Sequence, residues 1–315
     1  MKYLWLPWYW PTWTMFGVGW CLARLPLGLQ YLVGRLIAHV FFSLVPRRKA
    51  IIQVNLLLAF PELTVVQRDE MTRKTIEEFS RSMVETLFVW FRGVHALLER
   101  VNISGLEQLR NHEFEQGTIL LGAHFASLDL CGTAVSQRSP FQITYRDIKN
   151  PVANYLAVSR RRRAYEKLYL ATELKTVVNE LRNGKTVWFA TDQDMGTRKA
   201  TCFAPFFGVE ASTITTPFRL ARLTGARVVL MTHTRNNRER TWDVELHPIE
   251  LSKLAAPDCY VADATNVNRV IEQVIRSQPA QYFWVHRRFK TMANGQRRDY
   301  RLQKSGHSTR VSHSG

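Results

Sequence analysis

The sequence predicts an α/β fold, in which a mixed, largely parallel sheet is flanked by helices and preceded by an N-terminal hydrophobic helical membrane anchor. Two observations carry this prediction. After Ile103, short apolar runs alternate with stretches of helical periodicity, a pattern typical of parallel sheets whose strands are joined by helices. Before Glu62 the chain has no acidic residue and is apolar and rich in tryptophan. With 46% hydrophobic residues, the 315-residue chain can fill a sizeable core.

The first segment, Tyr3–Ala23, carries no charged side chain. It is about long enough to span the ~30 Å hydrocarbon core of a bilayer. Pro7 and Pro11 interrupt it, however, and its tryptophans fit a helix lying at the membrane interface. Spanning and interfacial attachment therefore both stay open. No Ala-x-Ala site follows the segment, so we do not expect a cleavable signal peptide.

A second apolar stretch, Leu25–Val45, is interrupted by Arg35 and predicts an amphipathic helix lying against lipid or against the rest of the protein. We assign residues 1–50 to the membrane anchor and this amphipathic helix. Residues 51–293 form the main domain. Residues 294–315 are polar, basic and rich in serine, which predicts a flexible basic tail.

The net charge of +17 predicts an anionic partner. Nucleic acid, lipid headgroups and an acidic protein all meet this condition. The basic residues near the N-terminus lie within the most apolar sequence, which favours membrane phospholipids over nucleic acid. By the positive-inside rule, the same residues place the domain on the cytoplasmic side of the membrane.

Helices and strands follow in a regular order. A helix over Ile51–Phe60 stops at Pro61, and Val66–Leu98 is a long helical region whose apolar stripe we expect to pack in the core. Gly184 and Gly225 fall just beyond predicted helices, where a C-terminal cap belongs. Strands are predicted over Thr118–Ala123, Gln142–Tyr145, Thr186–Ala190 and Val228–His233, and further helices over Ser127–Ser136, Val152–Tyr165, Glu173–Asn183, Pro217–Thr224 and Asp263–Ser277.

A histidine and an aspartate, His124 and Asp129, follow the predicted strand Thr118–Ala123 directly. In one continuous helix, side chains five residues apart would diverge, whereas a turn between strand and helix allows them to meet. An imidazole held by a carboxylate can act as a general base toward a hydroxyl group. A His-x4-Asp pattern by itself is also compatible with a purely structural pair. The strand end and the small neighbouring residues favour the catalytic interpretation.

Two further polar clusters also follow predicted strands. Arg146 comes after one strand, and an arginine run, Arg160–Arg163, ends the next helix. Guanidinium groups bind phosphates well, although one or two of these arginines would be simply solvated. Asp192 and Asp194 follow the strand Thr186–Ala190. Because ligands of open α/β sheets bind beyond the carboxyl ends of the strands, we expect the three clusters to face one crevice.

The sequence shows no clear metal site, disulfide framework or nucleic-acid-binding motif. The aspartates at 192 and 194 lack any spacing that demands a metal ion, and the four cysteines form neither a disulfide framework nor a zinc motif. Aromatic and basic residues mix in Gln281–Lys290. Such a mixture can stack nucleic-acid bases, but next to a membrane-attached domain we favour docking to the core or to lipid headgroups.

Taken together, these motifs resemble those of the lipid A biosynthesis acyltransferases, the lauroyl and myristoyl transferases of Gram-negative bacteria, within the lysophospholipid acyltransferase-like superfamily. The resemblance extends over residues 1–293. It rests on Asn55–Glu62, Gly122–Asp129, Tyr145-Arg146, Asn150-Pro151, the arginine run, Trp188–Gly196 and Gln281–Lys290.

The resemblance implies transfer of an acyl chain from the thioester of acyl carrier protein to a hydroxyl of a Kdo-lipid A precursor in lipopolysaccharide biosynthesis. Acyl carrier protein is then the co-substrate, no cofactor is needed, and the enzyme acts at the inner membrane. His124 would be the general base and Asp129 would orient it. Attack would be direct, because no serine or cysteine lies in a recognisable nucleophile motif.

For the remaining residues, Arg146, Arg161 and Arg163 would bind acceptor phosphates or the oxyanion, and Asp192 and Asp194 would shape the polar end of the site. The chain departs from the family pattern at two places. Some members have Glu at the position of Asp129, and some have another basic residue where this chain reads Leu170-Ala171-Thr172. The second departure prevents the transfer of any acyl-chain preference.

Two alternatives remain at the sequence level. The first is an acyltransferase for another glycolipid or for a lysophospholipid. The second is a non-catalytic membrane protein that binds anionic lipid through its basic clusters. Nucleic-acid binding is disfavoured, because no recognised motif accompanies the basic residues.

Overall fold

The computed structural model describes residues 2–109, 116–198 and 200–301. Its centre is a seven-stranded sheet in the order β1-β9-β8-β2-β5-β3-β4. β9 runs antiparallel to β8, and the other neighbouring pairs are parallel, so the predicted mixed, largely parallel α/β fold is confirmed. The strands are β1 (Val101–Ser104), β2 (Thr118–Gly122), β3 (Gln142–Tyr145), β4 (Leu168–Leu170), β5 (Thr186–Ala190), β8 (Arg227–Asn236) and β9 (Thr241–Ile249).

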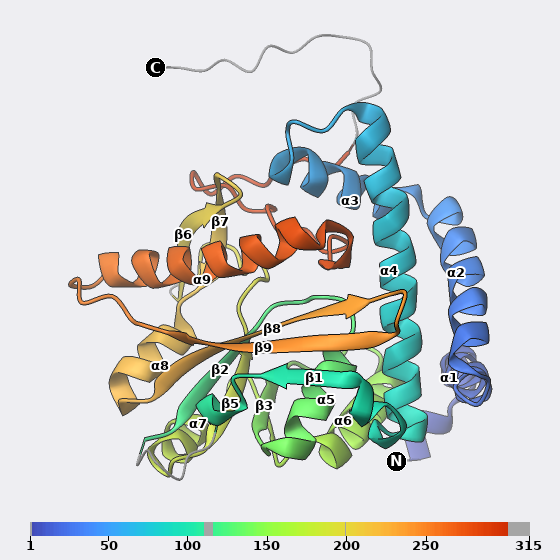
Figure 1. Cartoon of the computed structure of the whole chain (residues 1–315), viewed down its shortest axis with the longest axis horizontal. Coiled ribbons are helices and arrows are strands. Elements are labelled where there is room, and N and C mark those ends of the chain that lie inside the picture. The colour runs from blue at the N-terminus through green and yellow to red at the C-terminus, as the bar shows by residue number, and fades with distance from the viewer. Residues whose placement is uncertain (1, 110–115, 199, 302–315) are drawn as a thin grey trace.

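Helices cover both faces of the sheet (Figure 1). One face carries α5 (Leu128–Arg138), with α6 (Pro151–Ala164) beside it. The other carries α7 (Leu174–Arg182), α8 (Thr216–Thr224), α9 (Asp258–Ser277) and a two-stranded hairpin. The hairpin consists of β6 (Thr201–Phe206) and β7 (Val209–Ile214).

Successive residues of the central strands enter two different cores. In β2, Ile119 and Leu121 pack into the core beneath α9, whereas Leu120 packs into the core beneath α5. This alternation follows from the two-residue period of a strand. A strand buried on both faces reads as a continuous apolar run, which explains why β2 could be recognised from sequence.

All four predicted strands are present, and so are the helices predicted beyond Ile103. Gly184 and Gly225 adopt φ of 74° and 71°, as expected for helix C-caps. The long region Val66–Leu98 is not one helix: α4 (Val65–Arg92) ends at Gly93 and a 3₁₀-helix, His95–Arg100, follows. The five strands β1, β4, β6, β7 and β9 were not predicted from sequence.

The segment Tyr3–Ala23, for which spanning and interfacial attachment were both left open, is not one continuous helix. Short 3₁₀ turns precede α1 (Trp10–Leu22), whose 13 residues extend only about 20 Å. Within the described part of the chain, α2 (Leu27–Leu44) is the one helix long and apolar enough to cross a membrane. It packs along α4 (Figure 1), and Gly34 permits the close approach, since a Cβ there would lie 2.6 Å from Val84 Cγ2.

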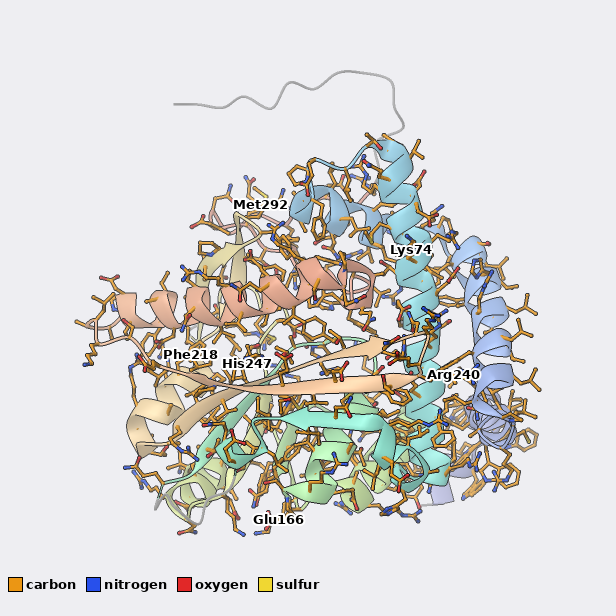
Figure 2. All side chains as sticks on the ribbon, in the orientation of Figure 1. Lys74, Glu166, Phe218, Arg240, His247 and Met292 are labelled. Atoms are coloured by element: carbon orange, nitrogen blue, oxygen red, sulfur yellow. The ribbon has the colours of Figure 1, made fainter. Side chains whose placement is uncertain are left out.

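The outward surfaces of α1 and α2 are apolar. Residues on both helices leave large hydrophobic side chains exposed, namely Trp10, Met15, Val18, Trp20, Leu29, Leu32, Leu36, Ile37, Val40, Phe41 and Leu44. An apolar surface of this kind on two adjoining elements is typical of contact with a membrane or a partner protein. The opposite, inward side of α2 contacts the turn between β8 and β9. Arg240 of this turn (labelled in Figure 2) lies against Gly28 at the start of α2.

Neither predicted boundary of the main domain falls between two structural elements that are separate from each other. Residue 50 falls inside α3 (Pro46–Ala59) rather than between elements. The tail predicted to be flexible, residues 294–315, includes Tyr300, which is buried against Ile51 and Val54. Its hydroxyl donates to Asn55 Oδ1 over 2.8 Å. Residues 302–315 lie outside the described residues.

A buried cluster of charges joins α4 to β8. Arg235 is 2% exposed and forms ion pairs with Glu78 and Glu85, both on α4. Glu85 also accepts from Tyr31 Oη of α2 over 2.7 Å, and Arg235 Nη1 donates to Ser127 Oγ over 3.1 Å. Each charge in the cluster therefore has a partner of opposite sign, which buried charges require.

We predict that Glu85→Ala lowers the free energy of unfolding by about 3–5 kcal/mol, because it leaves Arg235 charged and incompletely paired in the interior. Urea unfolding in a fixed nonionic detergent measures the change. Glu70→Ala on the same helix is the control, since its exposed pair with Arg73 should matter little. Similar losses for the two variants would contradict the prediction.

Candidate active site

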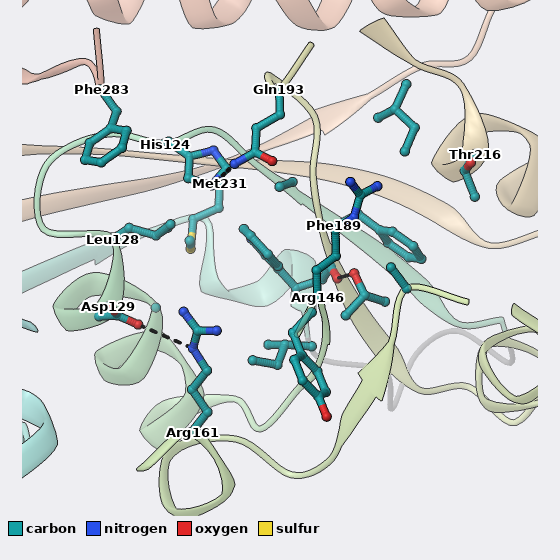
Figure 3. Close-up of a pocket in the computed structure, with 18 of the residues that line it drawn as sticks. His124, Leu128, Asp129, Arg146, Arg161, Phe189, Gln193, Thr216, Met231 and Phe283 are labelled. Atoms are coloured by element: carbon teal, nitrogen blue, oxygen red, sulfur yellow. Dashed lines mark hydrogen bonds and ion pairs between the residues drawn. The ribbon is translucent and has the colours of Figure 1, made fainter. Parts of the chain in front are cut away.

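A cavity of about 550 Å³ opens beyond the carboxyl ends of β2, β3 and β5 (Figure 3). Polar and charged groups line one part of it, namely His124, Asp129, Arg146, Arg161, Gln193 and Arg198. A second part extends between α5 and the sheet and is apolar, lined by Leu128, Gly132, Phe141, Ile143, Trp188 and Met231. Two of the three clusters predicted to share a crevice line this cavity, namely the pair His124 and Asp129 and the arginines at 146 and 161. Neither Asp192 nor Asp194 lines it, although Gln193 between them does.

His124 is held by Asp192. Nδ1 of His124 lies 2.6 Å from Asp192 Oδ1, and the backbone N–H of His124 donates to Asp192 Oδ2 over 2.9 Å. The carboxylate is buried, whereas 21% of the imidazole remains exposed. Strand register explains the pairing: Gly122 of β2 stands opposite Ala190 of β5, so the residues two steps beyond each strand also face each other.

This pairing fixes the tautomer of the imidazole. An ionised carboxylate can only accept, so Nδ1 of His124 carries the proton and Nε2 keeps its lone pair. Nε2 lies on the cavity side, where the amide of Gln193 approaches it at 3.2 Å (Figure 3). A hydroxyl group that replaces the Gln193 amide at this position would donate to Nε2 of the neutral ring, which is the arrangement that a general base needs.

The pKa values fit the same arrangement. Burial disfavours the charged imidazole, but attraction to Asp192 and the hydrogen bond with it outweigh burial, so the pKa of His124 is raised above its ordinary value. Burial also opposes ionisation of Asp192, yet His124 holds the pKa of that carboxyl well below its usual range. Burial lowers the pKa of the adjacent His286 to about 4, so that ring is neutral at neutral pH.

The C-terminal segment fixes the turn that carries His124. Phe283 N donates to His124 O over 2.9 Å, and Ala126 N donates to Gln281 O over 2.6 Å. Gln281 in turn bonds the backbone of Arg235 through both ends of its amide. The aromatic and basic segment Gln281–Lys290 thus docks on the core, which is one of the two roles expected from sequence.

Asp129 does not occupy the predicted position. Its carboxylate accepts from Thr86 Oγ1 over 3.2 Å and lies 3.9 Å from Arg161 Nε, while Asp192 holds the imidazole. The reason is local geometry: Ser127 adopts φ of 71°, and Asp129 then falls in the first turn of α5, where it faces α4 and α6. It still lines the cavity with His124, so its contribution to catalysis stays a prediction.

The other predicted residues divide between the cavity and its surroundings. Arg146 and Arg161 line the cavity, whereas Arg163 lines a smaller neighbouring cavity. Asp194 lines neither of these; it accepts from the backbone N–H and hydroxyl of Thr291 over 2.6 Å and 2.9 Å. Asp194 therefore anchors the C-terminal segment instead of shaping the polar end of the site. Within the described residues, no cluster of three His, Cys, Asp or Glu could hold a metal ion.

Comparison with known proteins assigns the chain to a family. A family model described as bacterial lipid A biosynthesis acyltransferase matches residues 2–291. The chain belongs to this family. The palmitoleoyltransferase of lipid A biosynthesis from Escherichia coli K12 is 32% identical over 298 residues, which cover 92% of this chain and 94% of that protein. The lauroyltransferase from the same strain is 32% identical over 293 residues, with the same two coverages.

A third E. coli K12 member of the family, the lipid A biosynthesis myristoyltransferase, is 26% identical over 261 residues, covering 81% of this chain and 78% of that protein. Membership makes the protein an acyltransferase of lipid A biosynthesis, in agreement with the resemblance seen in its sequence. It favours an enzyme over the non-catalytic lipid-binding alternative. The identities do not decide among the three acyl chains in these names.

Sequence reasoning missed two features of this acyltransferase. It singled out Asp192 but gave it no contact with His124, and it overlooked Gln193 at the imidazole. The signal was available in principle, because two adjacent parallel strands in matched register place the residues beyond their ends face to face. Recognising it requires knowing that β2 and β5 are neighbours, which local spacing does not reveal.

We predict that Asp192→Asn lowers kcat by about 10²–10⁴-fold, the range associated with a well-placed general base. It should also move the acid limb of the kcat/KM profile to lower pH, because burial continues to depress the pKa of His124 once the Asp192 charge is gone. Asp129→Asn serves as the comparison. A larger acid-limb shift in Asp129→Asn than in Asp192→Asn would refute the assigned pairing.

Proposed function

We propose that the protein transfers a fatty acyl chain from the thioester of acyl carrier protein to a hydroxyl on an acyl chain of a Kdo-lipid A precursor. The single observation that carries the proposal is the lone pair of His124 Nε2, which faces the cavity while Asp192 holds Nδ1. The family supplies the substrate class. An apolar slot beside a polar, cationic region suits an acyl chain joined to a reacting ester or thioester.

The proposed reaction proceeds by direct attack. The acceptor hydroxyl donates its proton to His124 Nε2 as its oxygen bonds to the thioester carbonyl carbon. When the tetrahedral intermediate collapses, the C–S bond breaks and the imidazolium returns the proton to the leaving thiolate. Asp192 stabilises the imidazolium during the interval, and its hydrogen bond keeps the ring oriented.

Charge that develops on the carbonyl oxygen needs a cationic or N–H donor nearby. Arg146 and Arg161 line the cavity and are our assignments for this role or for an acceptor phosphate. Burial lowers the pKa of Arg146, and repulsion from the guanidinium of Arg198 lowers it further. An anion in the cavity would relieve this repulsion, so the guanidinium groups of Arg146 and Arg198 would both stabilise it.

Attachment to the inner membrane is part of the proposal. One face of α2 packs on α4 and the opposite face is apolar and exposed. Arg35, in the middle of α2, lies 3.9 Å from Glu77 of α4, a charged contact poorly suited to the centre of a bilayer. We therefore propose that α1 and α2 lie at the cytoplasmic surface of the membrane, where the tryptophans of α1 favour the interface.

We predict that His124→Ala reduces acyl transfer by at least about 10²-fold while the protein remains folded and membrane-bound. The assay follows acylation of the lipid A precursor by mass spectrometry, with acyl carrier protein thioester as donor. His247→Ala, on β9 and bonded to Thr232, is the matched histidine control. Near-normal turnover by His124→Ala would exclude the proposed base.

The apolar slot also makes a prediction about acyl-chain length. Gly132 of α5 lines the slot, and a Cβ there would lie 2.8 Å from the hydroxyl of Tyr165. A larger side chain must therefore occupy the slot or displace a packed ring. Because each buried methylene contributes about 0.8 kcal/mol, two lost methylenes correspond to roughly 15-fold in kcat/KM.

Accordingly, we predict that Gly132→Leu changes donor preference toward shorter acyl chains, by up to roughly 15-fold for a two-carbon difference. Competition between donors of different length, analysed by mass spectrometry, measures the ratio. Gly17→Leu is the control, because Gly17 lies in α1 with no atom within 4 Å of its Cβ position. An unchanged ratio in Gly132→Leu would show that the acyl chain lies elsewhere.

A further inference from the structure

A second cavity, of about 260 Å³, adjoins the catalytic one. The two cavities share Asp129, Arg161 and Tyr165 as a common wall. The second lies between the C-terminal end of α4, the helix α5 and the last turns of α6. The proposed reaction places no reacting atom in it, although Arg161, assigned above to the oxyanion or to an acceptor phosphate, lines both cavities.

The charges around this cavity are unbalanced. Four arginines line it, Arg92, Arg160, Arg161 and Arg163, against one carboxylate, Asp129, which already lies 3.9 Å from Arg161. The Nε of Arg160 is buried and has no hydrogen-bond partner. A buried donor without a partner costs free energy, so the site gains from a ligand that accepts hydrogen bonds.

A structural explanation for the arginines must be considered. Arg161 and Arg163 lie in the last turn of α6, where cations are favourable to the helix dipole. That explanation does not account for Arg160, whose guanidinium lies over the ring of Phe91 and near Arg163. Burial lowers the pKa of Arg160 and repulsion from Arg163 lowers it further, which indicates a deficit of negative charge.

The apolar part of the wall indicates a lipid. Val89, Trp90 and Phe91 line the cavity beside the arginines. Trp90 stacks on Phe16 of α1, with ring centroids 6.3 Å apart, so the cavity adjoins the helix proposed to contact the membrane. A phosphate on a lipid headgroup at the membrane surface would meet both the cationic and the apolar part.

We propose that this second cavity binds a phosphate monoester on the sugar headgroup of the acceptor lipid, and thereby positions the acceptor hydroxyl at His124. The inference rests on the proposed function. A monoester dianion matches the excess of arginine better than the phosphodiester in the prosthetic arm of a carrier protein, which has one negative charge. Arg161, which lines both cavities, connects the phosphate subsite to the site of acyl transfer.

The test compares Arg160→Gln/Arg163→Gln with Arg162→Gln. Arg162 belongs to the same run but is exposed and lines neither cavity. Assays in nonionic detergent exclude phospholipid phosphate, and each enzyme receives the acceptor with and without its phosphate monoester. We expect the double variant to raise KM for the phosphorylated acceptor at least about 10-fold. Its KM for the dephosphorylated acceptor should equal that of the wild type.

Other outcomes would overturn the assignment. A rise in donor KM instead would assign the site to the carrier's phosphodiester, and equal effects on both acceptors would indicate a structural role. An equal effect of Arg162→Gln would indicate general surface charge. The single variant Arg163→Gln tests the same site if the double variant does not fold, because position 163 is exposed. It should raise KM for the phosphorylated acceptor, by less than the double variant does.

A binding measurement separates this inference from the proposed function. Calorimetry with N-acetylglucosamine 1-phosphate, a soluble phosphate monoester, requires no acyl transfer. We expect saturable binding to the wild type and to Arg162→Gln, with at least about a 10-fold loss in the double variant. Binding without turnover would leave the subsite intact and refute the proposed reaction. Turnover without binding, together with an unchanged acceptor KM, would refute only the subsite.

Discussion

The parallel register between β2 and β5 is the constraint on which the site depends. Gly122, the last residue of β2, pairs with Ala190, the last residue of β5. His124 and Asp192 each follow two residues later, so the same register brings them opposite each other. Gly122 is required at this point because Trp188 of β5 crosses over it, and a Cβ would overlap the indole ring. A slip of one residue would exchange the two faces of β2, so the two cores and the pair His124–Asp192 are fixed by the same strand pairing.

The turn after His124 is held from outside the sheet. Ser127 adopts a left-handed conformation with φ of 71°, which is unfavourable for a residue with a side chain. Its hydroxyl accepts from Arg235 Nη1 and from Trp242 Nε1, each over 3.1 Å. Because Arg235 is paired with two glutamates of α4, the conformation of the turn is coupled to the helix that also packs against α2. The proposed membrane-contacting layer and the turn that carries His124 are thus connected through buried ion pairs.

Much of the fold could be predicted from sequence because it follows from local pattern. The strands buried on both faces, such as β2 and β5, read as apolar runs, and helix ends showed their glycine caps. The short β1 and β4 are only partly buried and give no apolar run, whereas β3, as short as β1, is mostly buried and was predicted. The order of the strands is a property of the whole chain. The same limit applies to the site. His124 was identified because it follows a strand, but its partner, Asp192, is 68 residues away in sequence. The sequence analysis gave the role of partner to Asp129 instead, which is only five residues from His124. Likewise, the polar composition of residues 294–301 gave no sign of the buried contact of Tyr300.

The position of Asp129 acquires a different meaning once Asp192 is recognised as the partner of His124. Asp129 stands in the wall between the two cavities and lies near Arg161, the cation common to both. A direct transfer requires donor and acceptor to be present together, because no acyl-enzyme stores the acyl chain between two half-reactions. One apolar slot can hold the donor chain only if the acceptor is fixed by something else. The proposed cationic subsite beside the slot meets that requirement. Asp129, 3.9 Å from the guanidinium of Arg161, offsets one of the four arginine charges and leaves the rest of the subsite cationic.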